Sequence, residues 1–171
     1  MSHTNEDRKL ESARQAGAEE RYLAFQFGGE QYAIPLLLVR EVIEMSTPTP
    51  IPQAPSYFRG VIDLRGQLIS VIDLRVKLNL KQTTDGPKTA IIILNKENVN
   101  MGFIVDRVNS VLAFSSQDIS PPPHSVVGLE GPLIGVARSG NQVTMILNHQ
   151  VALDSHDIEL SKSLQSTKKT A

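Results

Sequence analysis

Four histidines are the first candidates for chemistry in this sequence, because an imidazole can bind a metal or transfer a proton near neutral pH. They are His3, His124, His149 and His156, and no two of them have the spacing expected of metal ligands. The His-Glu-x-x-His pattern of a zinc-binding helix does not occur in the sequence, and neither does cysteine. We therefore predict four surface histidines, no metal site and no disulfide.

Two aspartates also invite a catalytic interpretation, because paired carboxylates can act as acid and base. Asp63 and Asp73 each begin an Asp-Leu-Arg triplet, within or just after a predicted strand. Asp73 is better explained as the N-cap of a short helix over 74–80. Gly28-Gly29 has no phosphate-binding context, and no serine lies in a Gly-x-Ser-x-Gly setting. The sequence therefore predicts no active site, no bound cofactor and a protein that is not an enzyme.

The composition limits the kinds of partner. The 171 residues are 40% hydrophobic and 20% charged, with a net charge of -1, which is typical of a soluble globular protein. A small barrel that binds nucleic acid is the alternative function, but the balanced charge and the absence of tryptophan disfavour it. The longest apolar run, 90–94, is much shorter than the roughly 20 residues that cross a bilayer. We expect a cytoplasmic protein that does not insert into a membrane.

The elements that would position any site are mostly strands. Large apolar residues alternate with small or polar ones over 22–27, which is the period of a half-buried strand. Turn residues between apolar segments predict four hairpins, over 22–34, 60–73, 90–105 and 133–147. Helical pattern is limited to three short segments, over 36–40, 73–80 and 148–153. Many short strands of this kind predict an all-β barrel or sandwich.

The two halves of the chain carry related patterns. Six apolar positions recur 69 residues later: Leu23, Phe25, Tyr32, Val39, Val42 and Ile43 match Ile92, Leu94, Met101, Val108, Val111 and Leu112. Later positions recur at a distance of 75 residues, where Gly60-Val61 matches Gly135-Val136. Both halves also share the same order of hairpin, Val-x-x-Val segment, proline-bearing link, hairpin and short helix. This repeat predicts two small barrels packed together.

The repeat and the composition predict how the chain is divided. We expect a flexible N-terminal tail over 1–20, a folded region over 21–153 and a flexible or short-helical C-terminal tail over 154–171. Within the folded region the half-repeats cover about 22–80 and 88–153. The tails contain few large apolar side chains, which disfavours a packed core there.

Two neighbouring motifs resemble the CheW family of chemotaxis adaptors. Residues 58–66 read Phe-Arg-Gly-Val-Ile-Asp-Leu-Arg-Gly and residues 71–75 read Val-Ile-Asp-Leu-Arg, at the spacing that the family shows. A Gly-x-x-Val-Asp-x-Val-x-x-Val-Leu run over 102–112 also fits the family. The family's opening run is matched by Phe25, Phe27, Gly28, Tyr32, Ile34, Val39, Glu41 and Val42. The resemblance covers about residues 21–153.

The resemblance implies two intertwined five-stranded SH3-like barrels with short helices and flexible termini. It implies a non-enzymatic adaptor that couples the cytoplasmic tip of methyl-accepting chemoreceptors to the regulatory domain of a CheA-type histidine kinase. Such an adaptor would be recruited to membrane receptor arrays, and would bind neither a cofactor nor nucleic acid. A groove between the barrels would take the receptor, while barrel ends would contact the kinase at positions that the resemblance does not assign.

The family's receptor-binding positions fall on Val39, Glu41, Gly60, Arg65, Gly102, Val108 and Val111. Core packing and turn geometry are alternative explanations for the valines and glycines. Arg65 lies in the predicted turn at 65–66, where a long side chain can reach outward beside Glu41. A solvated turn arginine and a receptor contact are both compatible with that position, and the resemblance favours the contact.

Overall fold

The computed structural model describes residues 18–80, 84–122 and 131–168. Most of the predicted N-terminal tail therefore lies outside the described residues. Within these ranges eleven strands form two sheets. The strands are β1 (Glu20–Phe27), β2 (Glu30–Pro35), β3 (Val39–Glu44), β4 (Phe58–Leu64), β5 (Gln67–Asp73), β6 (Ala90–Lys96), β7 (Val99–Val105), β8 (Arg107–Phe114), β9 (Ile119–Ser120), β10 (Leu133–Ser139) and β11 (Gln142–Leu147).

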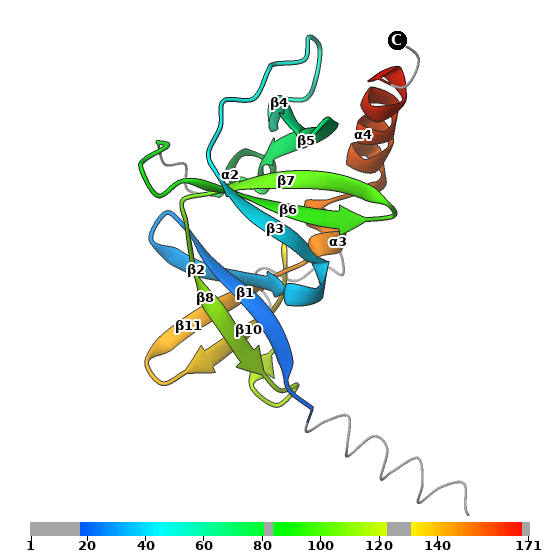
Figure 1. The fold of residues 1–171 in the computed structure, drawn as a ribbon. Helices are drawn as coiled ribbons and strands as arrows, with labels where there is room; N and C mark the ends of the chain where they lie inside the picture. The colour runs from blue at the N-terminus through cyan, green and yellow to red at the C-terminus, as the bar shows by residue number, and fades with distance from the viewer. Residues whose placement is uncertain (1–17, 81–83, 123–130, 169–171) are drawn as a thin grey trace, which may run out of the picture.

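The two sheets exchange hairpins between the halves of the chain. Sheet A has the strand order β8-β1-β2-β11-β10-β9, and sheet B has the order β3-β6-β7-β5-β4. Hairpin β1–β2 of the first half thus completes the sheet of the second half, and hairpin β6–β7 completes the sheet of the first. Figure 1 shows sheet B in the upper part of the molecule and sheet A below it. The prediction of an all-β fold with two intertwined units is confirmed, as are the four predicted hairpins.

The strand registers repeat with the offsets found in the sequence. Val39 of β3 pairs with Leu94 of β6, and the residues 69 positions away, Val108 and Phe25, pair in the same way between β8 and β1. The two parallel contacts also correspond, because Ser70 pairs with Met101 between β5 and β7 just as Met145 pairs with Tyr32 between β11 and β2. The two sheets are therefore related by an approximate internal twofold symmetry.

Neither sheet closes completely through backbone pairing in the part of the chain that the structure describes. Strands β3 and β4 are the two edges of sheet B. Glu41 of β3 nevertheless forms an ion pair with Arg65, which follows β4. Because a side-chain contact connects the two edges, sheet B must curl back on itself, and the result is an open, SH3-like barrel.

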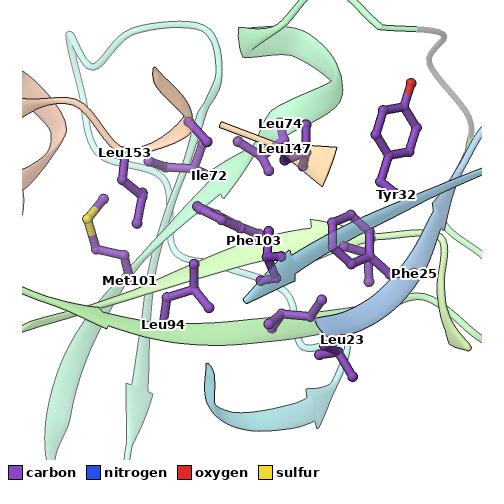
Figure 2. Packing of buried hydrophobic residues seen from close by; sticks show 14 of the residues in the cluster. Leu23, Phe25, Tyr32, Ile72, Leu74, Leu94, Met101, Phe103, Leu147 and Leu153 are labelled. Atoms are coloured by element: carbon purple, nitrogen blue, oxygen red, sulfur yellow. The ribbon is translucent and has the colours of Figure 1, made fainter. Parts of the chain in front are cut away.

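The largest hydrophobic core lies between the two sheets. Leu23, Phe25 and Tyr32 of sheet A belong to the same buried cluster as Leu94 and Phe103 of sheet B, and Figure 2 shows these side chains together. Each sheet also encloses a smaller cluster of its own, which contains Ile62, Ile69, Val71, Ile91, Ile93 and Ile104 in sheet B, and Tyr22, Ala33, Phe114, Ala137 and Ile146 in sheet A. Because the shared core is the largest, each half depends on the other for burial of its apolar residues.

These clusters explain the longest apolar run of the sequence. Along β6, Ile92 and Leu94 face the core between the sheets, whereas Ile91 and Ile93 face the core of sheet B. Successive side chains of a strand point to opposite faces, so a strand buried on both faces needs a continuous apolar run. All four residues are at most 1% exposed.

The described residues also include four helical elements: the 3-10 helix η1 (Leu36–Leu38), α2 (Leu74–Lys77), α3 (His149–Ala152) and the longer α4 (Ser155–Lys168). Asp73 caps α2 by accepting a hydrogen bond from the backbone N–H of Arg75, as predicted, and Asn148 caps α3 in the same way. The predicted helix over 36–40 was wrong beyond residue 38, because β3 begins at Val39. The helix predicted to end at residue 80 ends at Lys77.

Helix α4 packs against strands β5 and β7 of sheet B, as Figure 1 shows. Ser161 donates a hydrogen bond to the hydroxyl of Ser70 at 2.8 Å, and the Gln165 side chain donates to the carbonyl oxygen of Leu68 at 3.3 Å. At the start of the helix the fully buried Asp157 accepts a hydrogen bond from Tyr57 at 2.8 Å and pairs with Lys77. The C-terminal segment is thus fixed to sheet B and to α2 by polar contacts, and Ile158 of α4 also belongs to the core between the sheets.

A buried arginine connects α2 to both halves of the chain. The Arg75 side chain is 2% exposed and forms two hydrogen bonds with the Asp73 carboxylate, at 2.9 and 2.8 Å. It also pairs with Asp85 at 3.3 Å and with Asp106, at the β7–β8 junction, at 3.0 Å. The second oxygen of Asp106 accepts a hydrogen bond from the backbone N–H of Gly28 in the β1–β2 turn. This network fixes the turn of sheet A against α2.

Candidate protein-binding surface

Arg65 and Glu41 come together at the open mouth of sheet B. Arg65 and Gly66 have φ values of 51° and 84°, the signs required by a type I′ hairpin turn. The Asp63 carboxylate accepts a hydrogen bond from the Gly66 N–H at 2.9 Å and so stabilises the turn. From this turn the Arg65 side chain reaches the Glu41 carboxylate and remains 70% exposed, while Glu41 is 26% exposed.

The ion pair covers a small pocket of about 110 Å³ between the edges of the curled sheet. Its lining includes the apolar Ile69 and Ile93 as well as the polar Gln67 and Asn100. Asn100 donates a hydrogen bond to Gln67 at 3.3 Å, which fixes the two polar side chains. A surface ion pair with one strongly exposed member contributes at most about 1 kcal/mol to stability. The Arg65 guanidinium is therefore held at the surface by Glu41, although folding does not depend on this ion pair.

A strip of four valines flanks the core between the sheets. Val39 and Val42 of β3 pair with Leu94 and Ile92, and Val108 and Val111 of β8 pair with Phe25 and Leu23. All four partners belong to the core between the sheets. Directly opposed residues of an antiparallel pair lie on one face, so the four valines lie on the face that each sheet turns toward the other.

The valine strip is only partly covered. Val39 and Val108 are half-buried against the shared core, whereas Val42 is 43% exposed and Val111 is 50% exposed. Exposed apolar side chains beside a core are typical of a surface that a partner covers. Val42 was missed among the candidate residues, although the 69-residue offset that relates it to Val111 was available.

Gly60 is buried, and the backbone explains why the position is glycine. Its φ of 134° is unfavourable for residues with a side chain, and an added Cβ would lie 2.1 Å from the carbonyl oxygen of Thr49. This close approach lets Thr49 form a β-bridge with Val61. Gly60 therefore positions the β3–β4 link and offers no side chain to a partner.

Gly102 is also buried, in the middle of β7. An added Cβ would lie 2.7 Å from Cγ2 of Ile91, inside the core of sheet B. The structure thus brings Glu41 and Arg65 into direct contact, places Val39, Val108 and Val111 along the valine strip, and leaves Gly60 and Gly102 in packing positions. The Arg65–Glu41 pair and the valines of β3 lie on opposite faces of that strand. Glu41 pairs with Ile93, which faces the core of sheet B, whereas Val42 pairs with Ile92, which faces the core between the sheets.

The fold and this surface define an all-β interaction module. In the described ranges no three His, Cys, Asp or Glu side chains come together as a metal site requires. The helices of the same ranges are too short or too polar to span a bilayer. The exposed features are apolar side chains on the edge strands β3 and β8 and a charged side chain in the β4–β5 turn, and such groups suit protein–protein contact.

Comparisons with known proteins identify the family. The model of the CheW-like domain matches residues 21–157. The chemotaxis protein CheW of Treponema pallidum is 34% identical over 148 residues, which cover 84% of each chain, and protein FrzA of Myxococcus xanthus is 30% identical over 166 residues, which cover 96% of each. The crystal structure of the scaffolding protein TtCheW from Thermoanaerobacter tengcongensis matches with a TM-score of 0.73 and 26% identity, over 82% of this chain and 96% of that chain. This chain belongs to the CheW family and is a non-enzymatic adaptor of chemotaxis signalling.

Proposed function

We propose that this adaptor couples methyl-accepting chemoreceptors to a CheA-type histidine kinase, and that edge strand β3 carries the receptor contact. The valine strip provides the apolar part of the contact and covers one face of the helical receptor tip. The Arg65–Glu41 pair provides the polar part, with Arg65 free to rotate toward a carboxylate or carbonyl of the receptor. Gly60 and Gly102 act indirectly, by fixing the strands.

The observation that carries this proposal is the exposure of Val42 and Val111 beside a core that both sheets share. The two valines are related by the internal symmetry, so they flank the shared core from both sides. A receptor helix that lies along this core contacts both sheets at once. The kinase regulatory domain, by contrast, is proposed to contact barrel ends, and the resulting complex is recruited from the cytoplasm to membrane receptor arrays.

A charge reversal at position 65 tests the receptor contact. Arg65→Glu is expected to fold normally, to weaken binding of a receptor cytoplasmic fragment by about 1–3 kcal/mol, and to keep its affinity for the kinase regulatory domain. That affinity is expected to be micromolar, about -8 kcal/mol. Isothermal titration calorimetry of both complexes measures these values. Arg138→Glu, a charge reversal at an exposed arginine of β10, serves as the matched control.

The double variant Arg65→Glu with Glu41→Arg separates two explanations. It restores an ion pair across the edges of sheet B but leaves a negative charge at position 65. If Arg65 contacts the receptor directly, the double variant binds as weakly as Arg65→Glu. Recovery of receptor binding would show that only the closed mouth of sheet B matters, and unchanged binding of Arg65→Glu itself would refute the proposed contact.

A further inference from the structure

The internal symmetry relates the docking site of α4 to a second site on sheet A. On sheet B, α4 contacts Ser70 and Leu68 of β5 and packs against β7. The residues 75 positions later are Met145 and Val143 of β11, and β11 pairs with β2 in the same parallel register as β5 with β7. Sheet A therefore has a face that corresponds to the face beneath α4.

The corresponding face of sheet A forms an open hollow of about 460 Å³. Its lining comes from β1, β2, β11, the β1–β2 turn and the β10–β11 turn, and in the described part of the chain no helix contributes to it. Val143 is 43% exposed there and Met145 is only half-buried. The related residue Ser70, by contrast, is 2% exposed beneath α4.

The geometry of the covered site indicates what would fit the open one. Ser161 and Gln165, one helical turn apart, contact residues two apart on β5. A helical i,i+4 step of about 6 Å matches a strand i,i+2 step of about 6.8 Å. On β11 the matching pair is Val143 and Met145, which are apolar, so a helix bound there needs two apolar side chains four residues apart.

The rim of the hollow adds a charge requirement. It contains Gln26, Gln31, Asn141 and Gln142, which are neutral, and the exposed Glu30, which is acidic. The position related to Glu30 on sheet B is Val99, which is 2% exposed in the core beside α4. Sheet A thus carries a carboxylate at the edge of its face where sheet B buries an apolar residue. A lysine or arginine on the bound helix complements that carboxylate.

We infer that the hollow formed by β2 and β11 binds an amphipathic helix of a partner protein, in the way that sheet B binds α4. The helix presents two apolar residues at i and i+4 to Met145 and Val143, and a lysine or arginine to Glu30. This surface lies on sheet A, apart from the Arg65–Glu41 pair at the mouth of sheet B. It goes beyond the proposed receptor contact and adds a helix-binding surface to the adaptor.

A peptide derived from α4 provides a defined probe. The peptide has the sequence of residues 155–168 with Ser161→Ala and Gln165→Leu, which creates the apolar pair, and it keeps Lys162 as the cation. It is titrated into the isotopically labelled full-length chain, and backbone amide shifts are measured by NMR. Shifts are expected at Glu30, Val143 and Met145. The covalently attached α4 should keep its own site, because its effective concentration is high.

Two variants of the chain make the result specific. Val143→Asp is expected to weaken binding of the peptide by about tenfold or more. Val42→Asp, at an equally exposed valine of β3, is expected to leave the affinity for the peptide unchanged. Glu30→Lys is expected to weaken the parent peptide and to recover binding of a peptide with Lys162→Glu. Arg65→Glu is expected to leave peptide binding unchanged. A negative result for the helix-binding hollow is therefore distinct from a negative result for the receptor contact. The inference is overturned by absence of shifts at millimolar peptide, by shifts at the α4 site or the valine strip instead, or by equal binding to Val143→Asp.

Discussion

Replacing Arg75 with methionine removes the buried charge that compensates Asp73 and leaves the partly exposed Arg59, whose guanidinium lies 3.2 Å from the Asp73 carboxylate. The Arg75 side chain is 2% exposed and the Asp73 side chain 4% exposed, and their two hydrogen bonds are 2.9 and 2.8 Å long. Without the guanidinium, the Asp73 carboxylate has to remain charged in a buried position or take up a proton. Either outcome destabilises the folded state at neutral pH.

The expected loss is about 3 kcal/mol of unfolding free energy, the lower end of the range typical of removing one partner of a buried ion pair, because Arg59 still pairs with Asp73. Asp85 and Asp106 are 36% and 20% exposed, so their contacts with Arg75 add at most about 1 kcal/mol each. Methionine has a similar apolar stem, so little of the loss arises from a cavity. The estimate therefore depends mainly on the burial of Asp73.

The pH dependence gives an independent check. Burial acts to raise the pKa of Asp73, but the hydrogen bonds and charge of Arg75 hold it below its usual 3.8. In the parent chain the stability from this pair is present above pH 3.8 and is lost as the pH falls further. In Arg75→Met the burial and the weaker influence of Arg59 remain, so the pKa of Asp73 rises relative to the parent and the folded state binds the proton more tightly. The difference between variant and parent should shrink in acid.

Urea unfolding measures the free energies of these variants. Arg138→Met, at an exposed arginine, is the control and should change stability by about 0.5 kcal/mol or less. The double variant Asp73→Asn with Arg75→Met removes both charges and should be more stable than Arg75→Met alone. A loss below about 1 kcal/mol for Arg75→Met, or a double variant no more stable than the single one, would refute the reasoning.

Two further predictions concern the backbone of β4 and His149. Gly60→Ala should lose roughly 2–5 kcal/mol in urea unfolding, because of its φ of 134° and the 2.1 Å approach to Thr49; Gly86→Ala, with open space around it, is the control and should be nearly neutral. Burial and the charge of Lys96 hold the pKa of His149 below its usual 6.5, so the unfolded chain binds the proton more tightly and stability falls as the pH drops below 6.5. His149→Asn should reduce the fall in melting temperature between about pH 7.5 and about pH 5.5, and an unchanged fall, equal to that of a variant at the exposed His156, would contradict this.

The hairpins could be predicted from the sequence because strand alternation and turn residues are local signals. Strands β3 and β8 were not predicted, and a β-bulge explains why. The register shifts between Val39 and Glu41, and again where β8 pairs with β1. A bulge moves the following residues to the other face, so valines on one face are three residues apart instead of two. That spacing resembles a helical period, and the prediction of a helix over 36–40 included the start of β3.

The candidate site could be predicted only in part. The repeat related Val39 to Val108, and the turn at 65–66 indicated an outward Arg65, so these positions followed from local pattern. The burial of Gly60 and Gly102 depends on Thr49 of the β3–β4 link and on Ile91 of β6. The docking of α4 could not be anticipated either, because its contacts with β5 join residues more than 90 positions apart. Polar contacts over such distances leave no periodic signal.

The exchange of hairpins between the two sheets also determines the order in which they can form during synthesis. All strands of sheet B lie between residues 39 and 105, so this sheet can form as soon as β7 has left the ribosome. Hairpin β1–β2 emerges first, yet its partner strand β11 ends at Leu147, more than 100 residues after Pro35. At translation rates of about 5–20 residues per second the hairpin waits for roughly 5–20 s. During that time Phe25, Phe27 and Tyr32 can pack only against sheet B and strand β8, which pairs with β1. A chaperone that binds nascent apolar strands would therefore act on the first hairpin, and stalled synthesis before β11 would yield a product prone to aggregation.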